Sequence, residues 1–119
     1  MQTQEIIELA DGLGRALADS PQAQALRDAQ QQLQEDPEAS RLIGEYRDQA
    51  EKISRLEQEG KPVEPDDKHK LDELHSTLAS MPTFKKYTAA QFEYADLMRR
   101  VDDALSKHLG GDAQDAGSD

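Results

Sequence analysis

Residues 82–109 read PTFKKYTAAQFEYADLMRRVDDALSKHL, and this segment has the pattern of one long helix. Proline suits the first helical position, and the two glycines at 110 and 111 predict where the helix stops. Heptad spacing places seven residues along one face of this helix, as in a coiled-coil seam: Phe84, Tyr87, Gln91, Tyr94, Met98, Val101 and Leu105. At 1.5 Å per residue the helix is about 40 Å long. It therefore requires a long antiparallel partner or another subunit to cover its seam.

Similar signals divide the rest of the chain. Ser20-Pro21 and Asp36-Pro37 each place a capping side chain before a proline, which is typical of a helix start. Gly60 predicts a helix end, and the prolines at 62 and 65 predict a loop. We predict an all-α protein of about five helices, two of them long (37–59 and 82–109). These two are expected to form an antiparallel, coiled-coil-like helical bundle that oligomerises.

The domain organisation follows from the same reading. Residues 1–109 are predicted to form a single helical domain, because 119 residues favour one domain over two. Residues 110–119 contain three aspartates, no basic side chain and no large apolar side chain. Such a composition predicts a disordered acidic tail.

Composition narrows the function classes. The formal charge of −11 opposes binding to phosphate backbones, so we expect no direct nucleic-acid ligand. With no cysteine the chain has no disulfides, thiolate metal sites or cysteine nucleophile. No apolar run approaches the roughly 20 residues of a membrane span, and the first residues do not resemble a signal peptide. We expect a cytoplasmic protein without membrane contact.

No motif predicts a catalytic site, and no enzyme activity or cofactor is expected. Serines lack a nucleophile elbow, and no glycine-rich phosphate loop follows a strand. Asp72 and His75 are three residues apart and are the best metal-ligand pair. A di-iron bundle needs a second such motif, which is missing, so a solvated polar face is the preferred interpretation. A ligand- or metal-binding helical bundle stays the alternative function.

The apolar seams have two interpretations, an intrachain core or a subunit interface. Few large apolar residues are available to shield two long helices, and small domains are marginally stable, so we favour oligomerisation, as a dimer or higher. The oligomer-seam candidates are Tyr46, Ile53, Tyr87, Tyr94, Met98 and Val101.

The order of these features resembles the YlbF/YmcA family of small helical bacterial regulators, over roughly residues 5 to 109. The most specific part is the turn Gly60-Lys61-x-Val63 between two helices. The remaining positions are Leu13, Leu17, Leu26, Ala29, Leu33, Asp36-Pro37, Leu42, Tyr46, Leu71, Leu74, Leu78, Pro82, Tyr87, Ala90, Tyr94, Leu97 and Val101.

The resemblance implies an all-helical fold that forms dimers or larger oligomers and has no catalytic residues. Some members of the family are accessory factors in bacterial developmental regulation, within a complex that modulates messenger-RNA turnover. Cysteines that some of these members use for iron–sulfur clusters are absent here, so no cluster is implied. The leading hypothesis is a non-enzymatic, cytoplasmic regulatory protein that binds protein partners through helical surfaces. Direct RNA binding is a third possibility, which the negative charge opposes.

Overall fold

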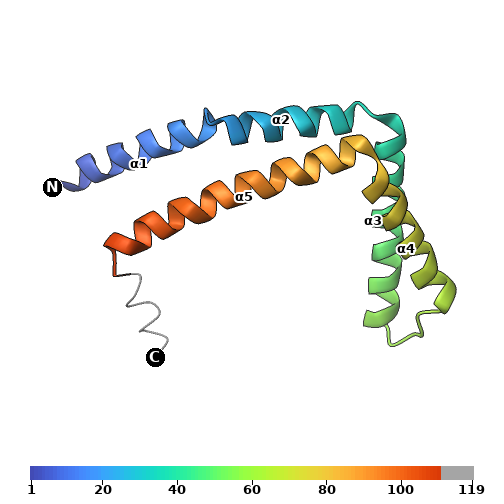
Figure 1. Cartoon of the computed structure of the whole chain (residues 1–119). Helices are drawn as coiled ribbons and strands as arrows, with labels where there is room; N and C mark the ends of the chain where they lie inside the picture. Colours follow the sequence, from blue (N-terminus) through green and yellow to red (C-terminus); the bar gives the residue numbers. More distant parts are fainter. Residues whose placement is uncertain (111–119) are drawn as a thin grey trace. The chain divides into compact units, whose positions relative to one another are not determined.

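The computed structural model describes residues 1–110, and these form five α-helices joined by short connections (Figure 1). The helices are α1 (Thr3–Ala18), α2 (Pro21–Gln34), α3 (Pro37–Gln58), α4 (Pro65–Ser80) and α5 (Pro82–His108). The all-α class, the five helices and packing as a helical bundle are confirmed, whereas oligomerisation stays a prediction. Apart from Gly110, the predicted acidic tail lies outside the described residues.

The helix ends lie where the capping signals placed them. The Ser20 hydroxyl accepts a hydrogen bond from the Ala23 amide at 3.1 Å, and the Asp36 carboxylate accepts one from the Ala39 amide at 3.2 Å. These bonds satisfy amide groups that the first turn of a helix leaves free. Each cap therefore fixes where a proline-initiated helix begins.

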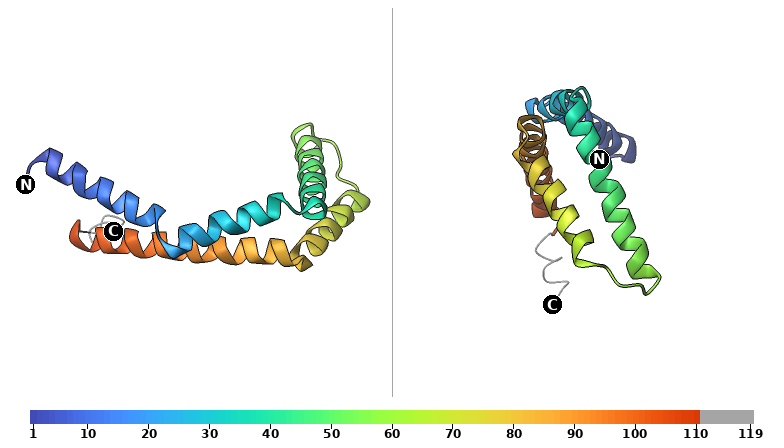
Figure 2. Two further views of the ribbon diagram at one scale, coloured as in Figure 1. Left: turned by 90° about the horizontal axis from the view of Figure 1, so that it is seen from above. Right: turned by 90° about the vertical axis from the view of Figure 1, so that its right-hand side faces the viewer.

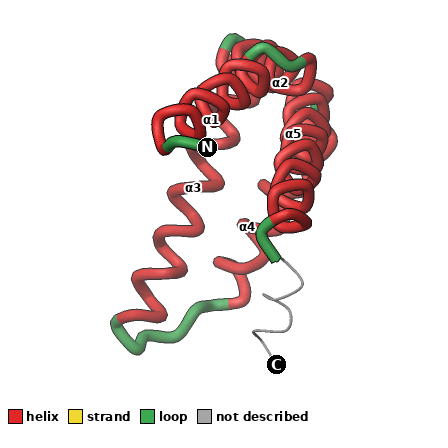
Figure 3. The backbone as a smooth tube through the Cα atoms, turned by 90° about the vertical axis from the view of Figure 1, so that its left-hand side faces the viewer, coloured by secondary structure: helices red, strands yellow, loops and turns green. Residues whose placement is uncertain are grey.

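Gly60 ends α3 with a left-handed backbone conformation, φ 70°. The Lys61 amide donates to the Leu56 carbonyl at 2.8 Å, and the Gly60 amide donates to the Glu57 carbonyl at 3.2 Å. This pair of bonds defines a Schellman motif, in which glycine avoids the steric penalty of positive φ. The chain then turns through residues 59–64, the longest connection between helices (Figure 3).

Close backbone contacts divide the chain into two compact units. Unit 1 comprises Met1–Arg27 together with the chain from Ala89 onward, and unit 2 comprises Asp28–Thr88. Helices α2 and α5 each contribute one part to each unit. The single helical domain expected over residues 1–109 stays a prediction.

Unit 2 is built on an antiparallel hairpin of α3 and α4, which lie side by side (Figures 1 and 2). Leu42, Leu74 and Leu78 form its core, each at most 8% exposed. The partly buried side chains that pack against this core are Ile43, Tyr46, Met81 and Phe84. The main helix partner of α3 is therefore α4, and α5 adds Phe84 from its first turn.

Polar contacts also hold unit 2 together. The amide of Gln49, a side chain only 5% exposed, donates to the Asp67 carbonyl at 2.9 Å. Lys52 forms a salt bridge with the Asp67 carboxylate at 2.9 Å. The Thr83 hydroxyl donates to the Asp36 carboxylate at 2.6 Å, which links the start of α5 to the start of α3. These bonds fix the register of the α3–α4 hairpin and the helix starts beside it.

Unit 1 combines α1, the first turns of α2 and the second part of α5. Helix α1 and this part of α5 run in opposite directions, so the start of α1 and the end of α5 lie at the same end of the unit (Figures 1 and 2). In the part of unit 1 that the structure describes, the buried side chains are two alanines, Ala23 and Ala90. Helix α1 has no buried residue at all.

Candidate interaction surface

Helix α1 exposes a complete apolar stripe. Ile6, Leu9 and Leu13 follow one another at helical spacing, and 51%, 64% and 38% of their surfaces are exposed. A helix of 16 residues is marginal in water by itself, and Gly12 and Gly14 weaken it further. A helix of this kind is stabilised by packing of its apolar face, yet no residue of α1 is fully buried among residues 1–110.

The second part of α5 presents a similar stripe in the same unit. Tyr94, Met98 and Val101 are half-buried, while Leu105 and Leu109 continue their face and are 49% and 80% exposed. Coverage of the α5 seam therefore decreases toward the end of the helix. We name the exposed stripe of α1 and this part of the α5 seam the unit 1 apolar surface; its residues are Ile6, Leu9, Leu13, Tyr94, Met98, Val101, Leu105 and Leu109.

Phe92 lies outside this surface, on another side of α5, and is 73% exposed. It lines a shallow depression of about 180 Å³ with Ala95, Asp96 and Arg99. Arg99 forms salt bridges with Asp96 at 2.7 Å and with Asp103 at 3.1 Å, and these acids raise its pKa, Asp96 most strongly. Because the Arg99 guanidinium is already paired with these two acids, the exposed ring of Phe92 is the distinctive feature of this face.

The other three seam candidates lie in unit 2 and are half-buried there. Tyr46 packs against the leucine core, and its ring centroid lies 6.2 Å from that of His75. Tyr46 therefore contributes to the packing of its own chain. Ile53 and Tyr87 are also intermediate in exposure, so the six candidates divide between the two units. Their role in an oligomer stays a prediction.

Two carboxyl groups of unit 2 have perturbed protonation equilibria. Hydrogen bonds from Thr83 and from the Ala39 amide lower the pKa of Asp36. A hydrogen bond from Lys52 lowers the pKa of Asp67, with a further contribution from the Glu64 amide. Both effects stabilise the charged form of a helix-capping carboxylate, which is a structural role.

The histidines do not assemble a metal-ligand cluster within residues 1–110. No group of three or more histidine, aspartate or glutamate side chains in this range is arranged to hold a metal ion. His69 lies 3.6 Å from Glu73 on the exposed face of α4, and His75 contacts Tyr46. The Asp72–His75 pair suggested by the sequence thus gains no third ligand here. No helix in the described range has the length and apolarity needed to cross a membrane.

The seam candidates predicted from the sequence do not include Ile6, Leu9 and Leu13, although these residues recur at helical spacing. The available signal was the combination of a clear apolar stripe with two glycines, which makes a helix dependent on external packing. Phe92 was also missed, because it lies outside the heptad seam. The available signal was its position, because a large aromatic residue outside the apolar face of a helix is expected to be exposed.

The chain is similar in sequence to a described protein family and to two relatives of that kind. A family model described as control of competence regulator ComK, YlbF/YmcA, matches residues 6–110. A UPF0342 protein of Streptococcus mutans is 30% identical over 89 residues, covering 75% of this chain and 79% of that protein. A UPF0342 protein of Desulfitobacterium hafniense is 22% identical over 115 residues, covering 97% of this chain and 88% of that protein.

Two solved structures share the fold. Bacillus subtilis RicA, in a crystal structure in complex with RicF, superimposes with a TM-score of 0.79 at 23% identity. That match covers 91% of this chain and 99% of the RicA structure's matched chain. A protein of unknown function (DUF964) from Bacillus stearothermophilus gives a TM-score of 0.67 at 19% identity, covering 88% and 92% of the two chains.

Proposed function

Because the chain belongs to the YlbF/YmcA family, whose model describes control of the competence regulator ComK, we propose that it is a non-enzymatic regulatory protein that acts by binding other protein chains. In this proposal the unit 1 apolar surface is the binding surface, and its first occupant is a second copy of the chain. The finer role that we propose is that of a cytoplasmic accessory factor in bacterial developmental regulation and messenger-RNA turnover.

The observation that carries the proposal is the uncovered stripe of α1. Fully burying a leucine or isoleucine side chain contributes about 1.5–3 kcal/mol, so Ile6, Leu9 and Leu13 together leave several kcal/mol unrealised. A row of exposed apolar side chains along one helix face is typical of an interaction site. Other chains are the natural occupants, since no helix of unit 1 within residues 1–110 fully buries a residue of α1.

The distribution of charge favours this surface as the place where two copies meet. Two chains of formal charge −11 repel each other, so they must meet where charges are sparse. The stripe of Ile6, Leu9 and Leu13 contains no charged side chain, and Glu8, Asp11 and Arg15 project from other positions around α1. A four-helix arrangement of α1 and the end of α5 from two copies would cover both stripes.

The complex between RicA and RicF offers independent support for a binding role. RicA shares this fold, and its crystal structure contains a second protein. A family whose model describes regulation, together with a fold that exposes apolar helix faces, fits action through protein contacts. We extend this behaviour to the present chain as part of the proposal.

The test compares two substitutions on α1 that add the same negative charge. Leu9→Glu places the charge within the stripe, whereas Gln4→Glu places it at an exposed polar position that hydrogen-bonds Glu8. Light scattering should give a mass of two or more chains for the wild type and for Gln4→Glu. Leu9→Glu should weaken association by roughly 100-fold, because a buried charge costs about 3 kcal/mol or more. A wild-type mass of one chain at high concentration would refute self-association.

A further inference from the structure

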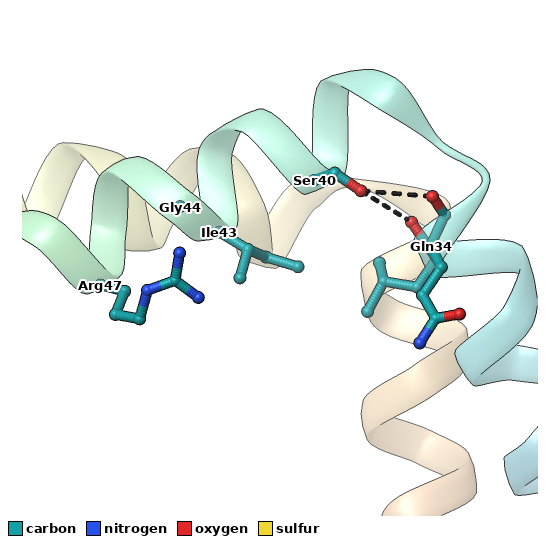
Figure 4. A pocket seen from close by; sticks show the side chains of 6 residues that line it. Gln34, Ser40, Ile43, Gly44 and Arg47 are labelled. Atoms are coloured by element: carbon teal, nitrogen blue, oxygen red, sulfur yellow. Dashed lines mark hydrogen bonds between the residues drawn. The ribbon is translucent and has the colours of Figure 1, made fainter.

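Unit 2 contains a pocket of about 350 Å³ in the bend between α2 and α3. Its lining residues are Leu33, Gln34, Ser40, Ile43, Gly44 and Arg47. Figure 4 shows Arg47 and Gln34 on opposite sides of the opening, with Ile43 and Ser40 between them. The pocket thus combines an apolar wall with polar side chains from two helices, a combination found in small-ligand sites.

Arg47 is the charged group of this pocket, and it has no ion-pair partner among the residues that the structure describes. Glu51 lies one turn further along α3, but the Arg47 guanidinium forms no salt bridge with it within residues 1–110. Its Nη2 atom instead lies 3.8 Å from where a Cβ on Gly44 would be. The absence of a side chain at Gly44 keeps the space beneath the guanidinium open.

Arg41, on the same helix, provides the contrast. Glu38 and Glu45 both pair with its guanidinium, and they raise its pKa, Glu38 most strongly. Arg41 is therefore satisfied by its own helix in this strongly acidic chain. Arg47 retains its hydrogen-bond donors for an external acceptor, and a guanidinium matches the planar geometry of a carboxylate.

The other polar groups can also donate to an anion. The Ser40 hydroxyl donates to the Leu33 and Gln34 carbonyls over 3.5 Å and 3.4 Å, which are long distances for such bonds. A hydroxyl held this weakly can rotate toward a ligand. Gln34 also lines the pocket, and its side-chain amide carries two further N–H donors (Figure 4).

The surroundings favour a single negative charge with an apolar body. The Leu33 and Gln34 carbonyls at the end of α2, and the negative chain as a whole, would repel a doubly charged phosphate more strongly than a singly charged carboxylate. Leu33 is 7% exposed and Ile43 packs against the leucine core, so both give the pocket a fixed apolar wall. We propose that this pocket binds a small monocarboxylate with a short aliphatic body, its carboxylate on Arg47 and its aliphatic part on Leu33 and Ile43.

Hexanoate is a suitable probe, with hexanol as the uncharged ligand of similar length. Titration of the ¹⁵N-labelled full chain by NMR should shift the amide signals of Gln34 and Gly44 and the Nε–H signal of Arg47. The expected dissociation constant is on the order of 1 mM for a ligand of this size. Equal binding of hexanol, or shifts confined to other residues, would overturn the assignment.

Arg47→Gln and Arg41→Gln form a matched pair, because each removes one guanidinium from α3. Arg47→Gln should weaken hexanoate binding at least tenfold, while Arg41→Gln should leave it within a factor of two. Equal weakening by both substitutions would show a general charge effect and overturn the proposal.

Gly44→Ala separates binding from folding. Alanine stabilises a helix relative to glycine, and the new Cβ would make only ordinary contact with Arg47. The melting temperature should therefore rise while the added methyl group narrows the pocket and weakens hexanoate binding several-fold. Unchanged binding in Gly44→Ala would overturn the location of the site.

The source of the carboxylate is tested with a short peptide that presents a glutamate beside a leucine. Binding of the peptide at Arg47 without binding of hexanoate would overturn the small-ligand assignment. The inference does not depend on the proposed self-association, because all lining residues belong to unit 2. Leu9→Glu should accordingly bind hexanoate as the wild type does, even where it no longer associates.

Discussion

Units 1 and 2 differ in how far their large apolar side chains are buried. In unit 2, Leu42, Leu74 and Leu78 are 4–8% exposed, and polar contacts such as Gln49 to the Asp67 carbonyl fix the hairpin around them. In unit 1, Leu9 is 64% exposed and α1 buries no residue. The difference teaches that unit 2 covers its large apolar side chains with its own residues, whereas unit 1 leaves a helix face exposed, which in the proposed function a second chain covers.

The largest expected effect tests the completeness of unit 2. Leu78→Ala should lower the free energy of unfolding by about 3 kcal/mol, because it leaves a cavity between α3 and α4. Urea denaturation should give the same loss at every protein concentration. Leu9→Ala, the corresponding change in unit 1, should instead reduce the concentration dependence of the melting temperature. If both variants showed the same change in concentration dependence, the distinction between the two units would be wrong.

A pair of glycine substitutions gives a smaller effect, of opposite sign in the two units. Gly60→Ala forces a Cβ into a left-handed conformation and should destabilise unit 2 by about 1 kcal/mol. Gly14→Ala meets no atom within 4 Å and should stabilise α1 by about 1 kcal/mol. Thermal unfolding monitored by circular dichroism measures both. A loss of stability in Gly14→Ala would show that α1 is closely packed at this point.

The smallest effect concerns pH and the cap of α3. The lowered pKa of Asp36 means that its contribution to stability is present above its unfolded pKa of about 3.9. That contribution disappears as the pH falls through the folded pKa. Asp36→Asn retains a good helix cap, but the asparagine side chain cannot titrate. The free energy of unfolding of this variant should therefore fall less steeply below pH 5 than that of the wild type. Parallel acid-unfolding curves for the two proteins would contradict this role.

Most of the fold could be predicted from the sequence, because its boundaries are encoded locally. Ser20-Pro21, Asp36-Pro37 and the Gly60 turn specify helix ends through bonds within a few residues. The helix pairing was harder to predict. The heptad seams of α3 and α5 are similar in period, and periodicity alone does not reveal that the core of α3 comes from Leu74 and Leu78 of α4.

The candidate surfaces were predictable only in part. The stripe of Ile6, Leu9 and Leu13 is visible in the sequence, but its exposure depends on which helices the chain places beside it. The pocket at Arg47 left no local signal, since Gln34 and Arg47 come from different helices and a solitary arginine is common on surfaces. Only the three-dimensional structure separates Arg47, which forms no salt bridge within residues 1–110, from Arg41, which pairs with Glu38 and Glu45.

Hydrogen exchange at two protein concentrations tests the central contrast most directly. One sample is concentrated enough to associate, and the other is diluted until light scattering gives the mass of one chain. We predict that dilution accelerates exchange of the α1 amides strongly, while the α3 and α4 amides around Leu42 and Leu78 keep their protection. Protection of α1 that does not change on dilution to one chain would contradict the account, because α1 would then be stabilised within its own unit.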